Sequence, residues 1–146
     1  VTECASLSQL RGNLGKFSDK QPAFGIYTGN QDYRLLLAPT SDPNASCLDQ
    51  LDVKILHDQI VNRLFGLDIT VPEDQKKISY KADTFQAVEM VRSGERQVAL
   101  LMNPTSINHV NEVALDGKTM PQKSTFFYPK LATGITLNLL NSPILI

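Results

Sequence analysis

The sequence predicts an α+β domain with a mixed sheet of about five strands and about four helices. Three observations support this prediction. A hairpin pattern spans residues 24–37, apolar residues recur at helical spacing in residues 3–17 and 53–65, and a strand–helix–strand pattern spans residues 78–103. The last pattern has the order of a βαβ unit, which predicts a right-handed crossover between two parallel strands.

Length and charge limit the classes of protein to which the chain can belong. Its 146 residues are enough for one domain with a sizeable core, and the formal net charge is −1. This balance creates no overall field that would attract nucleic acid or an anionic membrane. No apolar run approaches the ~20 residues that span a bilayer. Because the chain begins at Val1 without a signal pattern, we expect a single domain, residues 1–146, from a longer protein.

The cysteines and histidines form neither a metal-binding pattern nor a hydrolase pattern. Cys4 and Cys47 belong to no CxxC pair, and neither has a histidine at ligand spacing. No G-x-S-x-G elbow accompanies a serine, so a catalytic triad is not expected. Two free thiols are typical of a protein from the reducing cytoplasm. We therefore expect a cytoplasmic location and no metal, and the sequence leaves the cofactor unidentified.

The first quarter of the chain predicts a helix followed by a β-hairpin. Thr2 can cap a helix over residues 3–17, whose buried face would consist of Leu7, Leu10, Leu14 and Phe17. Strands over residues 24–27 and 33–37 follow. The turn between them is expected to be of the primed type, with Gly29 at its first central position.

The middle of the chain predicts a second helix and a solvated loop. Asp52 can cap a helix over residues 53–65, and Gly66 can end it. The buried stripe of this helix would consist of Val53, Leu56, Ile60 and Leu64. His57 lies beside that stripe, so it either marks the boundary of the core or stands at the edge of a site. The polar residues 72–77 predict a loop.

The second half of the chain predicts two strands, a helix between them, and two further elements. Residues 78–80 predict a short strand, residues 83–94 a helix, and residues 97–103 a strand whose apolar run is typical of a central position. A helix over residues 107–114 comes next. Residues 134–140 then predict a strand, because apolar side chains alternate there at Ile135, Leu137 and Leu139.

The first candidate site follows the predicted central strand, at Asn103-Pro104-Thr105-Ser106. Sheets with βα units bind ligands beyond the carboxyl ends of their strands, and a helix N-terminus favours phosphate or carboxylate. Asn103, Thr105 and Ser106 are therefore candidate ligand-binding residues. In the alternative, Ser106 only caps the helix and Pro104 only shapes the turn.

The second candidate site lies in residues 120–131, MPQKSTFFYPKL. Lysines with neighbouring hydroxyl groups, held between two prolines, can bind phosphate or carboxylate. The glycine-rich part of a P-loop is absent, so this is not a Walker A motif. In the alternative, the stretch is a surface loop with solvated lysines and inward-facing Phe126 and Phe127. The candidate ligand-binding residues are Lys123, Ser124, Thr125, Tyr128 and Lys130.

Three separate stretches also carry a family resemblance. Leu51-Asp52-Val53-x-Ile55-Leu56-His57 is followed by residues 103–106 and then by residues 120–131. Together they resemble the C-terminal part of the domain-of-unknown-function family 1015. The resemblance implies a bacterial or archaeal cytosolic protein with a further N-terminal part, and it implies that residues 120–131 belong to a site. The family itself has no assigned function.

Two functions fit these residues, and whether the protein is an enzyme stays open. In the first, the chain binds a small anionic metabolite, phosphorylated or carboxylated, with Lys123 as the main charge partner. An enzyme of this kind would be a small-molecule phosphotransferase, and its catalytic residues are unknown. In the second, the chain is a structural or interaction module in which residues 121–129 dock the N-terminal part of the protein or a second subunit. Neither function involves nucleic acid or a membrane.

Overall fold

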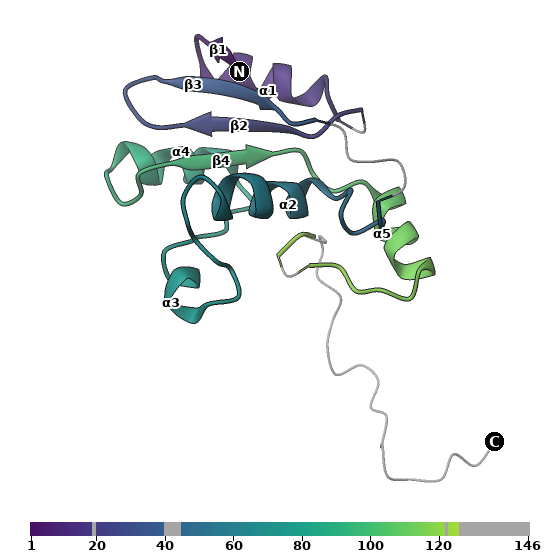
Figure 1. Ribbon diagram of the computed structural model, residues 1–146. Coiled ribbons are helices and arrows are strands. Elements are labelled where there is room, and N and C mark those ends of the chain that lie inside the picture. The colour runs from purple at the N-terminus through teal and green to yellow at the C-terminus, as the bar shows by residue number, and fades with distance from the viewer. Residues whose placement is uncertain (19, 40–44, 122, 126–146) are drawn as a thin grey trace, which may run out of the picture.

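The computed structural model describes residues 1–18, 20–39, 45–121 and 123–125, which form an α+β domain (Figure 1). No helix in these residues is long and apolar enough to cross a membrane. The strands are β1 (Thr2–Cys4), β2 (Ala23–Tyr27), β3 (Tyr33–Leu37) and β4 (Ala99–Met102). The helices are α1 (Leu7–Gly15), α2 (Asp52–Ile55), η1 (Leu56–Asn62), α3 (Pro72–Gln75), α4 (Thr84–Arg92) and α5 (Ile107–Leu115).

The four strands of the described residues form one antiparallel sheet with the order β1-β3-β2-β4. The predicted hairpin is confirmed as β2 and β3, with Tyr27 opposite Tyr33 next to the turn. β4 lies on the other side of β2, and Phe24 is opposite Met102. The predicted strand at residues 134–140 lies outside the described residues.

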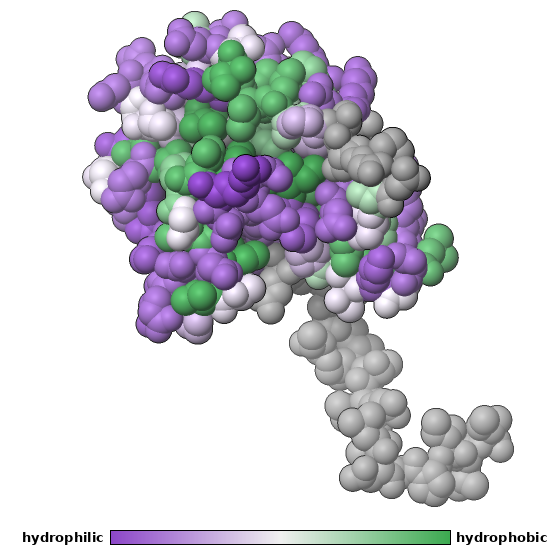
Figure 2. Space-filling model, viewed as in Figure 1, coloured by the Kyte–Doolittle hydropathy of each residue, from purple (hydrophilic) through white to green (hydrophobic). Residues whose placement is uncertain are grey.

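Helices cover both faces of the sheet, so the core has two main parts. On one face, α1 and α4 pack against the strands through Leu10, Leu14, Val88 and Val91. On the other face, Leu56 and Ile60 of η1 pack around Phe24 of β2. Figure 2 shows apolar side chains over β2 and β3, bordered by polar side chains over α2.

Gly25 of β2 sets how closely α1 approaches the sheet. A Cβ atom added at Gly25 would lie 3.0 Å from Leu10 Cδ2 and 3.2 Å from Leu101 Cβ. Ordinary carbon contacts are about 3.5–4.0 Å, so only a glycine fits there without movement of the helix. This close approach positions the carboxyl end of α1 beside the end of β4.

The prediction of a βαβ unit is not confirmed. Residues 78–80 form no strand, so α4 follows an irregular segment. β4 pairs with β2 in the antiparallel sense, and it lies at the edge of the described sheet, not in its centre. The apolar run of residues 98–102 indicates a buried strand, but it carries no information about which strand will be its neighbour. That choice depends on contacts with β2, more than seventy residues earlier in the chain.

The prediction that Thr2 caps the first helix is wrong. Thr2–Cys4 is β1, which pairs with β3 from Thr2 opposite Leu35 to Cys4 opposite Tyr33. The helix begins later, because the Ser6 side chain accepts a hydrogen bond from the backbone N–H of Gln9 at 3.2 Å. A short segment beside a hairpin gains backbone hydrogen bonds to the neighbouring strand. The spacing of apolar residues within the segment gives no sign of these bonds, because they depend on a distant strand.

The second helix is continuous from α2 into η1, a π-helix. Leu51 occupies the cap position and Asp52 is the first helical residue, so Asp52 is not the predicted cap. A π-helix has i→i+5 hydrogen bonds, and residues beyond it lose the 3.6-residue phase of the predicted stripe. Leu56 and Ile60 are accordingly buried, whereas Leu64 is 69% exposed.

The hairpin turn lies one residue later than predicted. The backbone N–H of Asp32 donates to the carbonyl of Gly29 at 2.8 Å, so Asn30 and Gln31 are the central residues. Their φ angles are 48° and 61°. Positive φ at both central positions is what a type I′ turn requires, so the primed type is correct and the position of Gly29 is not.

Candidate functional site

A small hollow lies at the carboxyl end of β4, where α5 begins. Its volume is about 120 Å³, which is more than a single water molecule needs and suits a phosphate or carboxylate group. Three parts of the chain, far apart in sequence, supply its lining: Ser18, Lys20, Gln21, Asp52, Asn103, Pro104, Thr105, Ser106 and His109. The first candidate stretch of the sequence therefore lines a hollow in the folded chain.

Two side chains of this stretch are held by hydrogen bonds to the helices on either side. Asn103 is buried, and its Nδ2 donates to the carbonyl of Leu14 near the end of α1 at 3.0 Å. Ser106 caps α5, because its Oγ accepts from the backbone N–H of Asn108 at 3.2 Å. The predicted cap is thus confirmed, and Ser106 lines the hollow as well. The positive end of the α5 dipole lies at the same place.

A hydrogen bond joins the described part of the second candidate stretch to the first. Thr105 Oγ1 donates to the carbonyl of Ser124 at 2.8 Å, and Ser124 Oγ donates to the carbonyl of Pro121 at 2.6 Å. Lys123 is exposed, with a φ of 62°. Lys123, Ser124 and Thr125 lie next to the hollow but do not line it. Tyr128 and Lys130 lie outside the described residues.

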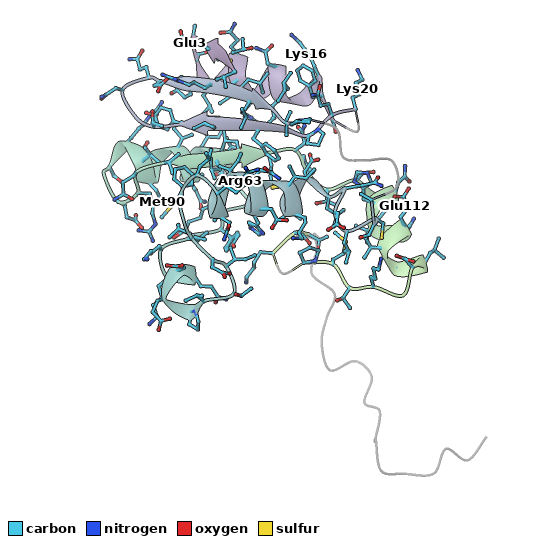
Figure 3. The ribbon with its side chains drawn as sticks, viewed as in Figure 1. Glu3, Lys16, Lys20, Arg63, Met90 and Glu112 are labelled. Atoms are coloured by element: carbon cyan, nitrogen blue, oxygen red, sulfur yellow. The ribbon has the colours of Figure 1, made fainter. Side chains whose placement is uncertain are left out.

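Lys20 lines the hollow, although the sequence reasoning missed it. It follows α1 in a turn where its backbone N–H donates to the carbonyl of Phe17 at 3.1 Å. The next residue, Gln21, donates from Nε2 to the carbonyl of Ala38 at 2.8 Å, which fastens this connection to the end of β3. Figure 3 shows Lys20 at the same end of the molecule as α5. An isolated lysine in a polar connection has no local signal, and only the packing of α1 on β2 brings it to residues 103–106.

The charges around the hollow are mixed. Lys20 contributes a positive charge, and the start of α5 adds a partial positive charge. Asp52, the first residue of α2, contributes a carboxylate, and His109 contributes an imidazole. An anion would therefore be attracted to the side formed by Lys20 and α5 and repelled from Asp52.

His57 lies in the core and does not line the hollow. Its ring stands edge-on to the ring of Tyr80, with 6.5 Å between the ring centroids. Burial lowers the pKa of His57, while the nearby Asp58 carboxylate raises it and Lys54 lowers it further. The structure thus places His57 as a buried residue of η1, outside the lining of the hollow.

The described residues bring together no nucleophile and base of a hydrolase. No serine hydroxyl in the described ranges is hydrogen-bonded to a histidine, and these ranges contain no cluster of three residues that could hold a metal ion. Both cysteines are free thiols. The Cys47 thiol donates to Asp116 Oδ2 at 3.4 Å, and partial burial, with this carboxylate, raises its pKa. At the hollow, hydrogen-bond donors and the cation of Lys20 surround a small space.

Comparison of the chain with protein-family models, with curated proteins and with solved structures found no match. The resemblance to family 1015 thus stays an expectation that rests on the three stretches named above.

Proposed function

We propose that this chain binds a small anionic metabolite, phosphorylated or carboxylated, in the hollow between the end of β4 and the start of α5. One observation carries the proposal. Folding brings Lys20 to Asn103, Thr105 and Ser106, the three residues of this stretch that the sequence indicates as ligand-binding. A cation, hydroxyl groups and a helix N-terminus around one small space are the groups that proteins use for anions.

Each group has a distinct role in this proposal. The ammonium group of Lys20 neutralises the anion, and the first-turn N–H groups of α5 that Ser106 does not cap donate to its oxygens. Asn103 positions the end of β4 against α1 through its bond to Leu14. The bond from Thr105 to Ser124 keeps Lys123 close enough to act as a second, more solvated cation. Lys123 was expected to be the main charge partner, and Lys20 takes that role here.

The size of the hollow limits what it can hold. About 120 Å³ accommodates an anionic group, and the remainder of a metabolite would extend into solvent or along residues 123–125. The resemblance to family 1015 implies that residues 120–131 belong to a site, and the bond from Thr105 to the Ser124 carbonyl is what connects that expectation to the hollow. If the complete protein is an enzyme, phosphoryl transfer to a small metabolite is the first reaction to assay.

Thermal shift with purified protein tests the proposal. The panel contains inorganic phosphate, pyrophosphate, glycerol 3-phosphate, a nucleoside triphosphate and citrate, with glycerol as the uncharged control, each at low and high salt. At least one anion should raise the melting temperature, and the effect should weaken at high salt because exposed charges are screened. No shift with any anion, combined with concentration-dependent dimerisation, would instead support the interaction module.

Three variants locate the site. Lys20→Ala should weaken binding roughly 10- to 100-fold, because a hydrogen bond to a charged group contributes about 1.5–3 kcal/mol. Asp52→Asn should strengthen it about fivefold, because the variant removes a repulsion of about 1 kcal/mol. Lys76→Ala, at an exposed lysine next to α3 that does not line the hollow, is the matched control and should leave the affinity unchanged. Equal affinities of Lys20→Ala and Lys76→Ala for the bound anion would contradict the proposed site.

A further inference from the structure

Opposite charges border the hollow between β4 and α5. Lys20 and Asp52 both line this space of about 120 Å³. An anion that enters it is attracted by Lys20 and by the start of α5, whereas the Asp52 carboxylate repels it. A ligand with a positive charge close to its anionic group turns this repulsion into an attraction. Asp52 therefore points to a second charged group on the ligand.

The fold fixes the place of Asp52 through the residues on either side of it. Leu51 and Val53 are 1% and 4% exposed, and they pack with Val113 of α5 in one apolar cluster. The start of α2 is thus held beside α5 (Figure 1). Because both of its neighbours are buried there, the half-buried side chain of Asp52 projects from a fixed position relative to α5.

Lys20 is anchored by a different part of the fold. It lies in the connection after α1, where Gln21 Nε2 donates to the carbonyl of Ala38 at 2.8 Å. Asp52 has a further interaction within the chain. A carboxylate has about four acceptor positions, so Asp52 can also accept a hydrogen bond from a ligand. The two charges are thus held at one small space, and each can contact a different group of the same ligand.

We propose that the ligand of this hollow is a zwitterion, in which an ammonium group lies a few bonds from a phosphate or a carboxylate. The inference rests on the proposed anion site and names the class of ligand that it takes. The anionic group contacts Lys20 and the start of α5, and the ammonium group donates to Asp52. Amino acids and the phosphates of small amino alcohols have this chemistry. The small volume favours them, because both of their charges fit within one space.

Two matched pairs of probes test the proposal in the unaltered protein. Aminoethyl phosphate is compared with propyl phosphate, and glycine with propionate, so that an ammonium group replaces a methyl group at nearly constant size. Amide chemical-shift titrations give the dissociation constants. The amino member of at least one pair should bind about fivefold more tightly than its methyl partner, because its ammonium group is attracted to Asp52. The pair that shows the preference identifies the anionic group as phosphate or carboxylate.

Asp52→Asn provides a second readout, because the proposal predicts different changes for the two members of a pair. The methyl member should bind about fivefold more tightly to this variant, since the repulsion is removed. The amino member loses an attraction together with that repulsion, so the preference for it should disappear. Asp58→Asn, at an exposed residue of η1 that does not line the hollow, is the matched control and should leave the preference unchanged.

Two outcomes would overturn the proposal while the anion site stands. The first is equal affinity of the unaltered protein for both members of each pair. The second is a preference for the amino member that persists in Asp52→Asn. If neither the probes nor inorganic phosphate bind, the anion site itself is wrong and this proposal fails with it. If Asp52→Asn does not fold, the comparison within each pair in the unaltered protein decides the question.

Discussion

Asn103 joins the end of β4 to the end of α1, so its replacement tests how the hollow is held together. Its Nδ2 donates to the carbonyl of Leu14 at 3.0 Å, and the residue is only 8% exposed. Asn103→Ala removes a buried hydrogen bond with a net contribution of about 1 kcal/mol and leaves a small void. The Leu14 carbonyl still accepts a hydrogen bond from the N–H of Phe17 at 3.1 Å, so the variant does not leave it without a donor and the loss of stability is limited. We expect a loss of about 1–2 kcal/mol in the free energy of unfolding.

Asn103→Asp should be more damaging than Asn103→Ala at neutral pH. It replaces the donor group by an oxygen and would place a carboxylate against the Leu14 carbonyl in a buried position. Burial raises the pKa of a carboxyl group, and the protonated acid can donate a hydrogen bond to the carbonyl as the amide does. The additional loss, about 1–3 kcal/mol, should therefore be present at pH 7 and diminish as the pH falls through the raised pKa of the introduced carboxyl.

Urea unfolding of the unaltered protein and the two variants between pH 8 and pH 5 measures both effects. The slopes of the unfolding curves should agree, so that differences in midpoint report stability. Equal losses for Asn103→Ala and Asn103→Asp at every pH would refute the reasoning, because the side chain would then not face the Leu14 carbonyl.

Three further predictions follow from the fold. Gly25→Ala should lose about 1–3 kcal/mol of stability, because its Cβ would lie 3.0 Å from a buried leucine of α1. Gly12→Ala, with nothing within 4 Å, should gain about 1 kcal/mol from helix propensity, and urea unfolding measures both. Gln31→Gly should stabilise the fold by about 0.5 kcal/mol and so raise the thermal midpoint slightly. The φ of Gln31 is 61°, and glycine adopts a positive φ without strain. His57→Leu should flatten the pH dependence of stability measured from pH 7.5 to pH 5.5. Burial lowers the pKa of His57 below its ordinary value of 6.5, so the neutral side chain stabilises the fold fully above that value and this contribution is lost as the pH falls below it.

Each of these three predictions has its own control. Similar losses for the two glycine variants would show that contact with α1 does not limit the residue at position 25. Gln31→Ala keeps the Cβ atom and therefore the strain of a positive φ. If it raised stability as much as Gln31→Gly does, backbone strain would not be the cause of the gain. A fall in stability below pH 6.5 that is the same with and without His57 would contradict its placement in the core.

Elements with signals inside a few residues could be predicted from the sequence. The apolar stretches on either side of Gly29 predict the hairpin, and the pairing of β2 with β3 confirms it. Ser106 is predictable as a cap because the N–H group that it binds lies two residues further along the chain. In the structure Asp83 Oδ1 accepts from the N–H of Phe85 at 2.9 Å, and Ser106 does the same for Asn108. Such hydrogen bonds depend on local spacing alone.

Features that depend on distant partners could not be predicted. β1 forms because Thr2–Cys4 meets β3, and β4 takes its direction from β2. Lys20 lines the hollow in a connection that Gln21 fastens to the carbonyl of Ala38, seventeen residues further along the chain. None of these contacts leaves a pattern in the neighbouring residues. Residues 103–106 therefore indicate the place of the hollow. The sequence pattern indicates Lys123 as its cation, whereas in the structure Lys20 lines the hollow and Lys123 does not.

Titration of inorganic phosphate into isotopically labelled protein, followed by amide chemical shifts, tests the central claim most directly. The account predicts that the largest changes fall on residues 103–109 and on Lys20 and Gln21. These changes should persist in Lys76→Ala and disappear over the same concentration range in Lys20→Ala. Changes concentrated elsewhere in the chain, or unchanged in Lys20→Ala, would contradict an anion site in this hollow.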